Sequence, residues 1–233
     1  QGSGSGLATI DDKTPTAAEE IWDGLDGTTV GGLVGTAGNT GVFNYINSMG
    51  GVTLNAAARK GSGTANSDGS SSGQGQNAWD FALTGAGDML GMEGLAWGLG
   101  YGSADNGTVS TGPADGDDDE HMTLFVNYTM GPVTAGYQIS SIANGSGGAT
   151  DEEVDQWGIA INVNDSLSVS YGERDVEYDK PSAVNVTENG EGIAVAYTMG
   201  SVKIAGNRNE VVNNNGTVAS NDQMTEIALS FAF

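Results

Sequence analysis

Acidic side chains gather near the beginning of the chain. Residues 1–41 have no strand pattern, and they carry six carboxylates: Asp11, Asp12, Glu19, Glu20, Asp23 and Asp26. Carboxylates that border a narrow polar space attract cations, because low-dielectric walls focus the field of the charges. The same residues would also suit the solvated surface of an exposed helix, and this alternative stays open.

Basic side chains are scarce. The chain has 7 Lys and Arg residues against 30 Asp and Glu residues, which gives a net charge of −23. Such a charge repels nucleic acid, so we expect cations rather than nucleic acid as partners. Three cations fall on the small or polar side of a two-residue alternation and are candidates to face the acids across an enclosed space: Arg59, Arg174 and Lys203.

A second acidic run lies in the middle of the chain. It is a candidate site for a divalent cation such as Ca²⁺, which prefers oxygen ligands, and it contains Asp115, Asp117, Asp118, Asp119 and Glu120. The spacing is not that of an EF-hand loop, and a solvated charged loop is the favoured interpretation of the run. Apart from this candidate, we expect no metal site and no cofactor.

The sequence argues against an enzyme. With one histidine and no cysteine, the chain cannot build a His-paired nucleophile or a multi-histidine metal site within itself. The Gly69–Gly73 stretch, GSSSG, has the spacing of a nucleophile elbow, but it lies in a low-complexity loop with no helical pattern after it.

The elements that would position these residues are strands. From residue 42 onward, side chains alternate between bulky apolar and small or polar with a period of two, which predicts about eleven strands. We expect them at Phe43–Met49, Val52–Lys60, Asn77–Gly87, Gly94–Ser103, Met122–Met130, Val133–Ile142, Asp155–Val163, Leu167–Val176, Gly192–Met199, Val202–Glu210 and Gln223–Phe233. Short turns and long polar connections alternate between them.

One hairpin pattern occurs three times, at residues 44–53, 127–134 and 196–203. Each copy has a tyrosine just before the turn. These tyrosines, with the two aromatic residues at the end of the chain, predict an aromatic girdle at a membrane–water interface: Tyr45, Tyr128, Tyr197, Phe231 and Phe233. Scattered core aromatics are the alternative.

The strand pattern also decides how the chain could meet a membrane. It contains no stretch near the 18 or so apolar residues that a membrane helix needs, so a helical membrane protein is excluded. Connections that alternate between short and long are typical of an antiparallel transmembrane β-barrel, which has short turns at one end and long loops at the other. A soluble β-sandwich is the competing all-β fold.

The chain resembles the Gram-negative porins, most closely the alphaproteobacterial general-diffusion porins. The likeness rests on the terminal QMTEIALSFAF, on the Y-T-M-G hairpins and on the segment IDDKTPTAAEEIWDG. It implies a homotrimer in the lipid of the bacterial outer membrane, with residues 1–41 as an infolded constriction loop that carries a short acidic helix, and residues 42–233 as barrel strands. Because porins of this kind have sixteen strands, eleven of them after that loop, we expect about five N-terminal strands to be absent from this sequence.

The resemblance implies a water-filled channel for passive diffusion of small hydrophilic solutes and ions. The surplus of carboxylates predicts a preference for cations. Two other functions remain open: an acidic adhesin or structural barrel of the outer membrane, and a substrate-specific sugar channel. The latter would need an aromatic track along the pore, for which Phe125 is the clear candidate.

Overall fold

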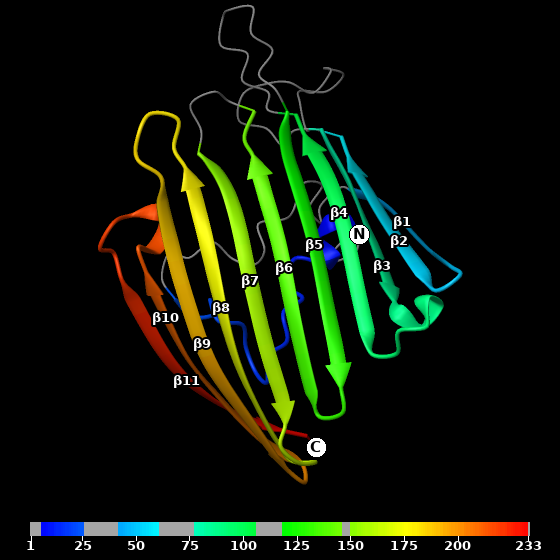
Figure 1. Ribbon diagram of the computed structural model, residues 1–233, viewed down its shortest axis with the longest axis vertical. Coiled ribbons are helices and arrows are strands. Elements are labelled where there is room, and N and C mark those ends of the chain that lie inside the picture. The colour runs from blue at the N-terminus through cyan, green and yellow to red at the C-terminus, as the bar shows by residue number, and fades with distance from the viewer. Residues whose placement is uncertain (1–5, 26–41, 61–76, 106–117, 146–149, 233) are drawn as a thin grey trace, which may run out of the picture.

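The computed structural model describes residues 6–25, 42–60, 77–105, 118–145 and 150–232. Within them the chain forms one antiparallel sheet of eleven strands, whose spatial order from β1 to β11 follows the sequence. The sheet is strongly curved (Figure 1). No helix among these residues is long and apolar enough to cross a membrane.

The strands confirm the predicted all-β architecture. Their bounds are β1 Val42–Met49, β2 Val52–Arg59, β3 Ala78–Ala86, β4 Leu95–Ala104, β5 Asp119–Met130, β6 Val133–Ala143, β7 Asp151–Asn162, β8 Leu167–Asp179, β9 Val186–Met199, β10 Val202–Val212 and β11 Asp222–Phe231. Short 3-10 helices occupy η1 Gly6–Thr9, η2 Gly87–Leu90 and η3 Asn214–Gly216. The short turns lie at one end of the sheet, the lower end in Figure 1.

The sheet has two faces of opposite character. In β5, Thr123 and Phe125 are buried on one face, whereas Leu124 and Val126 are exposed on the other. We call the first the inner face; it also carries Asn55, Asp80, Gln138, Ser170, Arg174 and Asn209. The outer face carries exposed apolar residues, among them Trp79, Tyr128, Trp157, Ile193 and Leu229. A polar inner and an apolar outer face are what a transmembrane barrel wall requires.

Residues 6–25, which we call the inner segment, lie across the inner face (Figure 1). Its first part is anchored by apolar packing, because Leu7 and Ile10 are fully buried against Ala82 and Phe125. The rest of the segment runs on along the inner face, where it contacts side chains of β5, β6, β8 and β10.

The short acidic helix expected within residues 1–41, for which Thr14 would be the cap, Pro15 the first position and Gly24 the end, does not form, and this expectation was wrong. These residues form bends and a turn, and the helical turn of the segment is η1 instead. The reason is competition for the backbone. The hydroxyl of Thr16 donates to Glu19 O at 2.6 Å, and Asn209 on β10 donates to the carbonyls of Glu20 and Asp23. The local backbone bonding that remains there is a turn, in which Asp23 N donates to Glu20 O at 3.1 Å.

Candidate functional site

Side chains of the wall hold the backbone of the inner segment. At its start, the amide of Gly6 donates to Asn55 Oδ1 at 2.9 Å, and the amide of Leu7 donates to Asp80 Oδ1 at 3.1 Å. Both acceptors are buried, on β2 and β3 respectively. Buried polar groups need such partners, so these bonds fix where the segment begins its path across the inner face.

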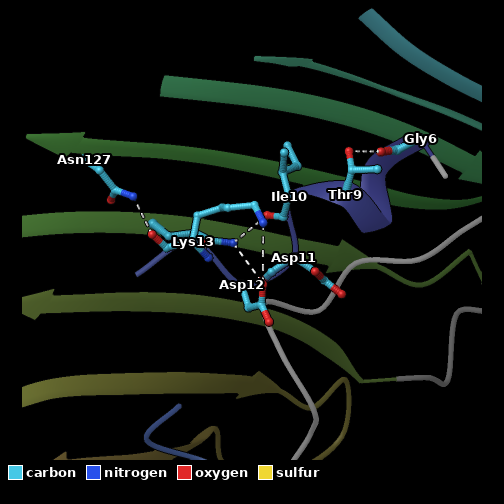
Figure 2. Close-up of polar contacts among 8 residues, drawn as sticks. Gly6, Thr9, Ile10, Asp11, Asp12, Lys13 and Asn127 are labelled. Atoms are coloured by element: carbon cyan, nitrogen blue, oxygen red, sulfur yellow. Dashed lines mark hydrogen bonds and ion pairs between the residues drawn. The ribbon is translucent and has the colours of Figure 1, made fainter. Parts of the chain in front are cut away.

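The middle of the segment is held by two amide side chains. Gln138 on β6 accepts from Lys13 N at 2.8 Å and donates to the carbonyls of Ile10 at 3.1 Å and Asp11 at 3.0 Å. Asn127 on β5 donates to Lys13 O at 2.6 Å, as Figure 2 shows. Figure 2 also shows the side chain of Ile10 and the carboxylates of Asp11 and Asp12 leaving the backbone in different directions.

The end of the segment is held in the same way. The hydroxyl of Ser170 on β8 accepts from Ala17 N at 2.9 Å. Asn209 on β10 donates to Glu20 O at 3.0 Å and to Asp23 O at 2.9 Å. Because the wall binds the backbone of the segment, these bonds leave the carboxylate side chains out of the anchoring.

The structure brings five of the six predicted acids together on the inner segment; Asp26 lies outside the described residues. Asp12 and Glu19 are exposed, and Asp11, Glu20 and Asp23 are partly buried. Within the described part of the chain, the ion pair that involves these acids joins Asp12 Oδ1 to Lys13 Nζ at 3.7 Å. The arrangement is therefore a group of carboxylates with a single paired cation.

Burial perturbs two of these acids. Loss of water raises the pKa of Asp11 above its ordinary 3.8, and the neighbouring charge of Asp12 raises it further. Burial likewise raises the pKa of Glu20 above its ordinary 4.5, with smaller contributions from the other acids of the segment. The pKa shifts show that these carboxylates lack enough positive charge nearby to offset their desolvation.

Arg174 requires a correction. It lies on the inner face, as its parity predicts, but it does not face the acids as an open wall cation. Its side chain is 2% exposed, its Nη1 lies 3.1 Å from Glu188 Oε1, and its guanidinium lies 5.4 Å from the ring centre of Trp22. The charge of Arg174 is thus neutralised by a buried partner and covered by the inner segment.

The other two predicted wall cations also lie on the inner face. Arg59 is the last residue of β2, points to the same face as Asn55 and is half-buried. Lys203 is the second residue of β10, points to the same face as Asn209 and is exposed. Among the described residues, neither forms an ion pair with an acid of the inner segment. Their opposition to the acids across a lumen stays a prediction.

The acidic run in the middle of the chain is only partly a loop. Asp119 and Glu120 belong to β5, and Asp115 and Asp117 lie outside the described residues. Three carboxylates bind separate partners: Ser103 Oγ donates to Asp118, Gly145 N to Asp119 and Tyr101 Oη to Glu120. In the described ranges, no three acidic or histidine side chains are placed to share a metal ion. A Ca²⁺ site in this run stays a prediction.

Four of the five aromatic residues predicted for a girdle lie on the outer face, toward the end of the sheet that carries the short turns. Tyr45 is 48% exposed, Tyr128 45%, Tyr197 43% and Phe231 54%, and Phe233 lies outside the described residues. Exposed aromatic rings at the ends of strands suit an interface between lipid and water. The girdle itself remains a prediction.

Sequence reasoning missed a second aromatic row nearer the long connections. The hydroxyl of Tyr171 donates to Glu173 Oε1 at 2.7 Å and to Glu191 Oε2 at 2.8 Å, and Trp157 Nε1 donates to Glu173 at 3.3 Å. Tyr137 likewise donates to Asp155. The sequence carried a local signal for Tyr171 alone, which Glu173 follows two positions later on the same side of the alternation. The acidic partners of Tyr137 and Trp157 lie on neighbouring strands.

Phe125 is not part of an aromatic track. Its side chain is 5% exposed and is covered by Leu7 and Ile10 of the inner segment. A ring that is covered by this segment is not accessible for a passing sugar to stack against. The structure thus removes the residue on which the sugar-channel alternative depended.

Solved structures share this fold. A porin refined at 1.8 Å resolution has a TM-score of 0.68 and 14% identity, and the match covers all of this chain and 76% of that porin. The anion-selective porin from Comamonas acidovorans has a TM-score of 0.59 and 14% identity, and the match covers 84% of this chain and 60% of that porin. The outer-membrane channel DcaP of Acinetobacter baumannii has a TM-score of 0.58 and 14% identity, and the match covers 99% of this chain and 71% of DcaP. The chain thus spans about three fifths to three quarters of their lengths.

No curated protein matches the chain. The family model of the Gram-negative porins, however, matches residues 4–232, nearly the whole sequence. The polar inner face, the apolar outer face and the segment held across the wall agree with this match. The chain belongs to the Gram-negative porin family, and it is an outer-membrane protein of the β-barrel class.

Proposed function

We propose that the chain forms a water-filled channel through which small hydrophilic solutes and ions diffuse passively, with a preference for cations. The observation that carries the proposal is the inner segment, which the wall fixes across the inner face by its backbone. Its carboxylates stay outside that anchoring, and Lys13, a cation of the same segment, is paired with one of them, Asp12.

The charge balance of the inner segment favours cations. Two unit charges about 4 Å apart interact by roughly 1 kcal/mol in bulk water and several-fold more near a low-dielectric wall. Asp12, Glu19 and Asp23 therefore suffice to shift relative permeation several-fold if they border the narrowest passage. Arg174 does not offset them, because its charge is already paired with Glu188.

The fold alone does not set the sign of selectivity. The porin from Comamonas acidovorans shares the fold and is described as anion-selective. Selectivity must therefore come from side chains, and in this chain those of the inner segment are acidic. The supporting evidence is local to residues 11–23 and does not depend on the net charge of the whole chain.

The test is a reversal-potential measurement in a planar bilayer under a salt gradient. We expect a cation-selective channel whose selectivity weakens as salt rises, because exposed charges are screened beyond about 10 Å at 0.1 M ionic strength. The double variant Glu19→Gln/Glu20→Gln should move the reversal potential toward zero. The control Glu153→Gln/Glu177→Gln removes the same charge from a directly opposed pair on the outer face and should leave the potential unchanged.

Two results would contradict the proposal. An anion-selective channel, or one that is indifferent to the Glu19 and Glu20 double change, would show that the inner segment does not line the passage. A folded, inserted protein without conductance would instead favour the adhesin or structural alternative.

We further propose that the protein assembles as a homotrimer. The support is the family, together with OmpT of Vibrio cholerae, a fold neighbour that is described in a trimer form. The mass of the detergent-solubilised protein, measured by light scattering, tests this. A monomeric mass under conditions in which the channel conducts would exclude the trimer.

A further inference from the structure

Four glycines form a continuous row on the inner face of the wall. Gly136 on β6 lies opposite Gly158 on β7, Gly158 lies opposite Gly172 on β8, and Gly172 lies opposite Gly192 on β9. The next position in the same register, on β10, is Asn209, which binds the inner segment. We call these four residues the glycine row.

Backbone conformation does not explain this row. All four glycines have φ outside the left-handed region that favours glycine, so any residue could adopt their backbone. Glycine weakens a strand, because it has no side chain to pack and loses more conformational entropy on folding. Inside a strand it commonly marks a place where another backbone comes close.

The close neighbour is the inner segment itself. A Cβ atom at Gly158 would lie 2.8 Å from the carbonyl oxygen of Pro15, and one at Gly136 would lie 2.4 Å from Pro15 Cδ. At Gly192 a Cβ would lie 2.9 Å from both Cβ and Cγ2 of Ile21. Real Cβ atoms essentially never approach other heavy atoms so closely, so a side chain at Gly136, Gly158 or Gly192 would collide with the segment. At Gly136 and Gly192 it would also meet Asn127 Oδ1 at 2.1 Å and Asn209 Oδ1 at 2.5 Å, whose side chains bind the segment. At Gly172 the closest atoms are Trp157 O of the wall at 2.9 Å and Ile21 Cγ2 at 3.3 Å.

The fit between the segment and the row is tight. The space enclosed between them is about 10 Å³, and its lining includes Pro15, Ile21, Gly158, Gly172 and Gly192. A cavity of this size holds about one water molecule. Asn127 on β5 and Asn209 on β10, which both bind the segment, lie at the two ends of the row. Gln138 and Ser170, which also bind the segment, lie two residues from the row on β6 and β8.

We propose that the glycine row is a seat that sets how far the inner segment stands out from the wall, and thereby sets the size of solute that passes. This inference rests on the proposed channel function and deepens it. Because every position of the row lacks a side chain, the segment lies as close to the wall as backbone contact allows. The row therefore leaves the passage as wide as this segment permits.

The first test measures conductance. The variant Gly158→Ala adds a methyl group where the obstacle is a backbone carbonyl, which cannot rotate away, so the segment must lift from the wall. We expect a lower single-channel conductance and a lower size limit for neutral polymers. The matched control is Gly190→Ala on the inner face of β9, where a Cβ would lie 3.6 Å or more from its neighbours. Equal conductance in Gly158→Ala and the parent, or equal losses in the two variants, would overturn the proposal.

A second test does not depend on conduction. The chain has no cysteine, and Thr16 Oγ1 lies 3.5 Å from Ser170 Oγ, so the pair Thr16→Cys/Ser170→Cys should form a disulfide that ties the segment to the wall. Adding Gly158→Ala should lower the yield of this disulfide, and adding Gly190→Ala should not. If the parent protein did not conduct at all, the channel function would be refuted. If adding Gly158→Ala left the disulfide yield unchanged, the proposal that the glycine row positions the segment would be refuted.

A third variant separates the seat from a general loss of folding. Gly192→Ala meets Cβ and Cγ2 of Ile21 and the side-chain oxygen of Asn209, so it should also lower the disulfide yield. The added change Ile21→Gly should restore part of the yield, because it removes both Ile21 atoms that collide. Variants that still form the sheet are identified in SDS gels, where they should keep the mobility of the folded protein until they are boiled. If Ile21→Gly gave no rescue in such a folded variant, the contact between Gly192 and Ile21 would not control the position of the segment.

Discussion

Two arginine–glutamate pairs lie on opposite faces of neighbouring strands. On the inner face, Arg174 and Glu188 are 2% and 1% exposed; on the outer face, Arg208 and Glu210 are 53% and 43% exposed. The residue types are the same, but the surroundings differ. The buried pair holds several elements together, whereas the exposed pair can exchange its partner for water.

The buried pair has many partners. Glu188 also accepts from the hydroxyl of Tyr178 at 3.3 Å and from the amide of Asn215 at 2.6 Å, and Arg174 lies under the ring of Trp22. The pair thus connects β8, β9, η3 and the inner segment. Burying two charges is costly, so the pair is stable only while each charge keeps its partners.

The largest effect is expected from breaking the buried pair. Arg174→Ala leaves Glu188 buried without its counter-charge, so the free energy of unfolding should fall by about 3–5 kcal/mol. Urea unfolding of the protein in lipid vesicles measures this. Replacing both partners, as Arg174→Met/Glu188→Leu, should recover most of the loss. A fall of less than about 1 kcal/mol in the single variant would mean that water reaches Glu188.

An intermediate effect is expected at the half-buried acids of the inner segment. Their raised pKa values mean that protonation of Asp11 and Glu20 begins at a higher pH than for ordinary carboxylates. Cation selectivity should therefore begin to weaken while ordinary carboxylates are still ionised. Reversal potentials measured between neutral and acidic pH test this, and Asp11→Asn/Glu20→Gln should move the onset to lower pH. An onset that is the same in this variant would assign the change to other groups.

The same acids affect stability with a defined sign. Because their pKa values are higher in the folded state, the folded state binds more protons in the window above their ordinary values of 3.8 and 4.5. Their contribution to stability is therefore favourable at low pH and is lost as the pH rises through the folded pKa. Relative to the parent, Asp11→Asn/Glu20→Gln should be stabilised more at neutral pH than at acidic pH. A difference that does not vary with pH would contradict this sign.

The smallest effect is expected from the exposed pair. Arg208→Ala should change the free energy of unfolding by only about 0–1 kcal/mol, and the difference should shrink as salt is added. The same urea experiment measures it beside Arg174→Ala. If the two substitutions cost the same, burial would not be what distinguishes the two pairs.

The sequence was sufficient to predict the number of strands, but it predicted the strand ends less accurately beside the long connections than beside the short turns. The short turns are marked by glycines with positive φ, such as Gly50, Gly131 and Gly200, so strand ends next to them were predicted accurately. At the other end β7 begins at Asp151 and β9 at Val186, earlier than predicted. Acidic residues interrupt the apolar alternation there, while the backbone continues to pair.

The site was harder to predict, because its partners are far apart in the sequence. Thr14, Pro15 and Gly24 are ordinary signals for a short helix, yet side chains of the wall bind the backbone at Ala17, Glu20 and Asp23 and hold the segment in bends and a turn. Parity placed Arg174 on the correct face, but no local pattern reveals that Glu188 and Trp22 cover it. Local signals describe an element well only when its hydrogen bonds are local.

The bonds that hold the inner segment also constrain the order of folding. Gly6 binds a residue 49 positions away, Ala17 one 153 positions away, and Glu20 one 189 positions away. Closing such long loops before the sheet exists has an entropic cost that no neighbouring contact offsets. Residues that precede every described strand in the sequence can thus reach their final place only after β2 to β10 have paired, so docking of the inner segment is a late step in maturation of the wall.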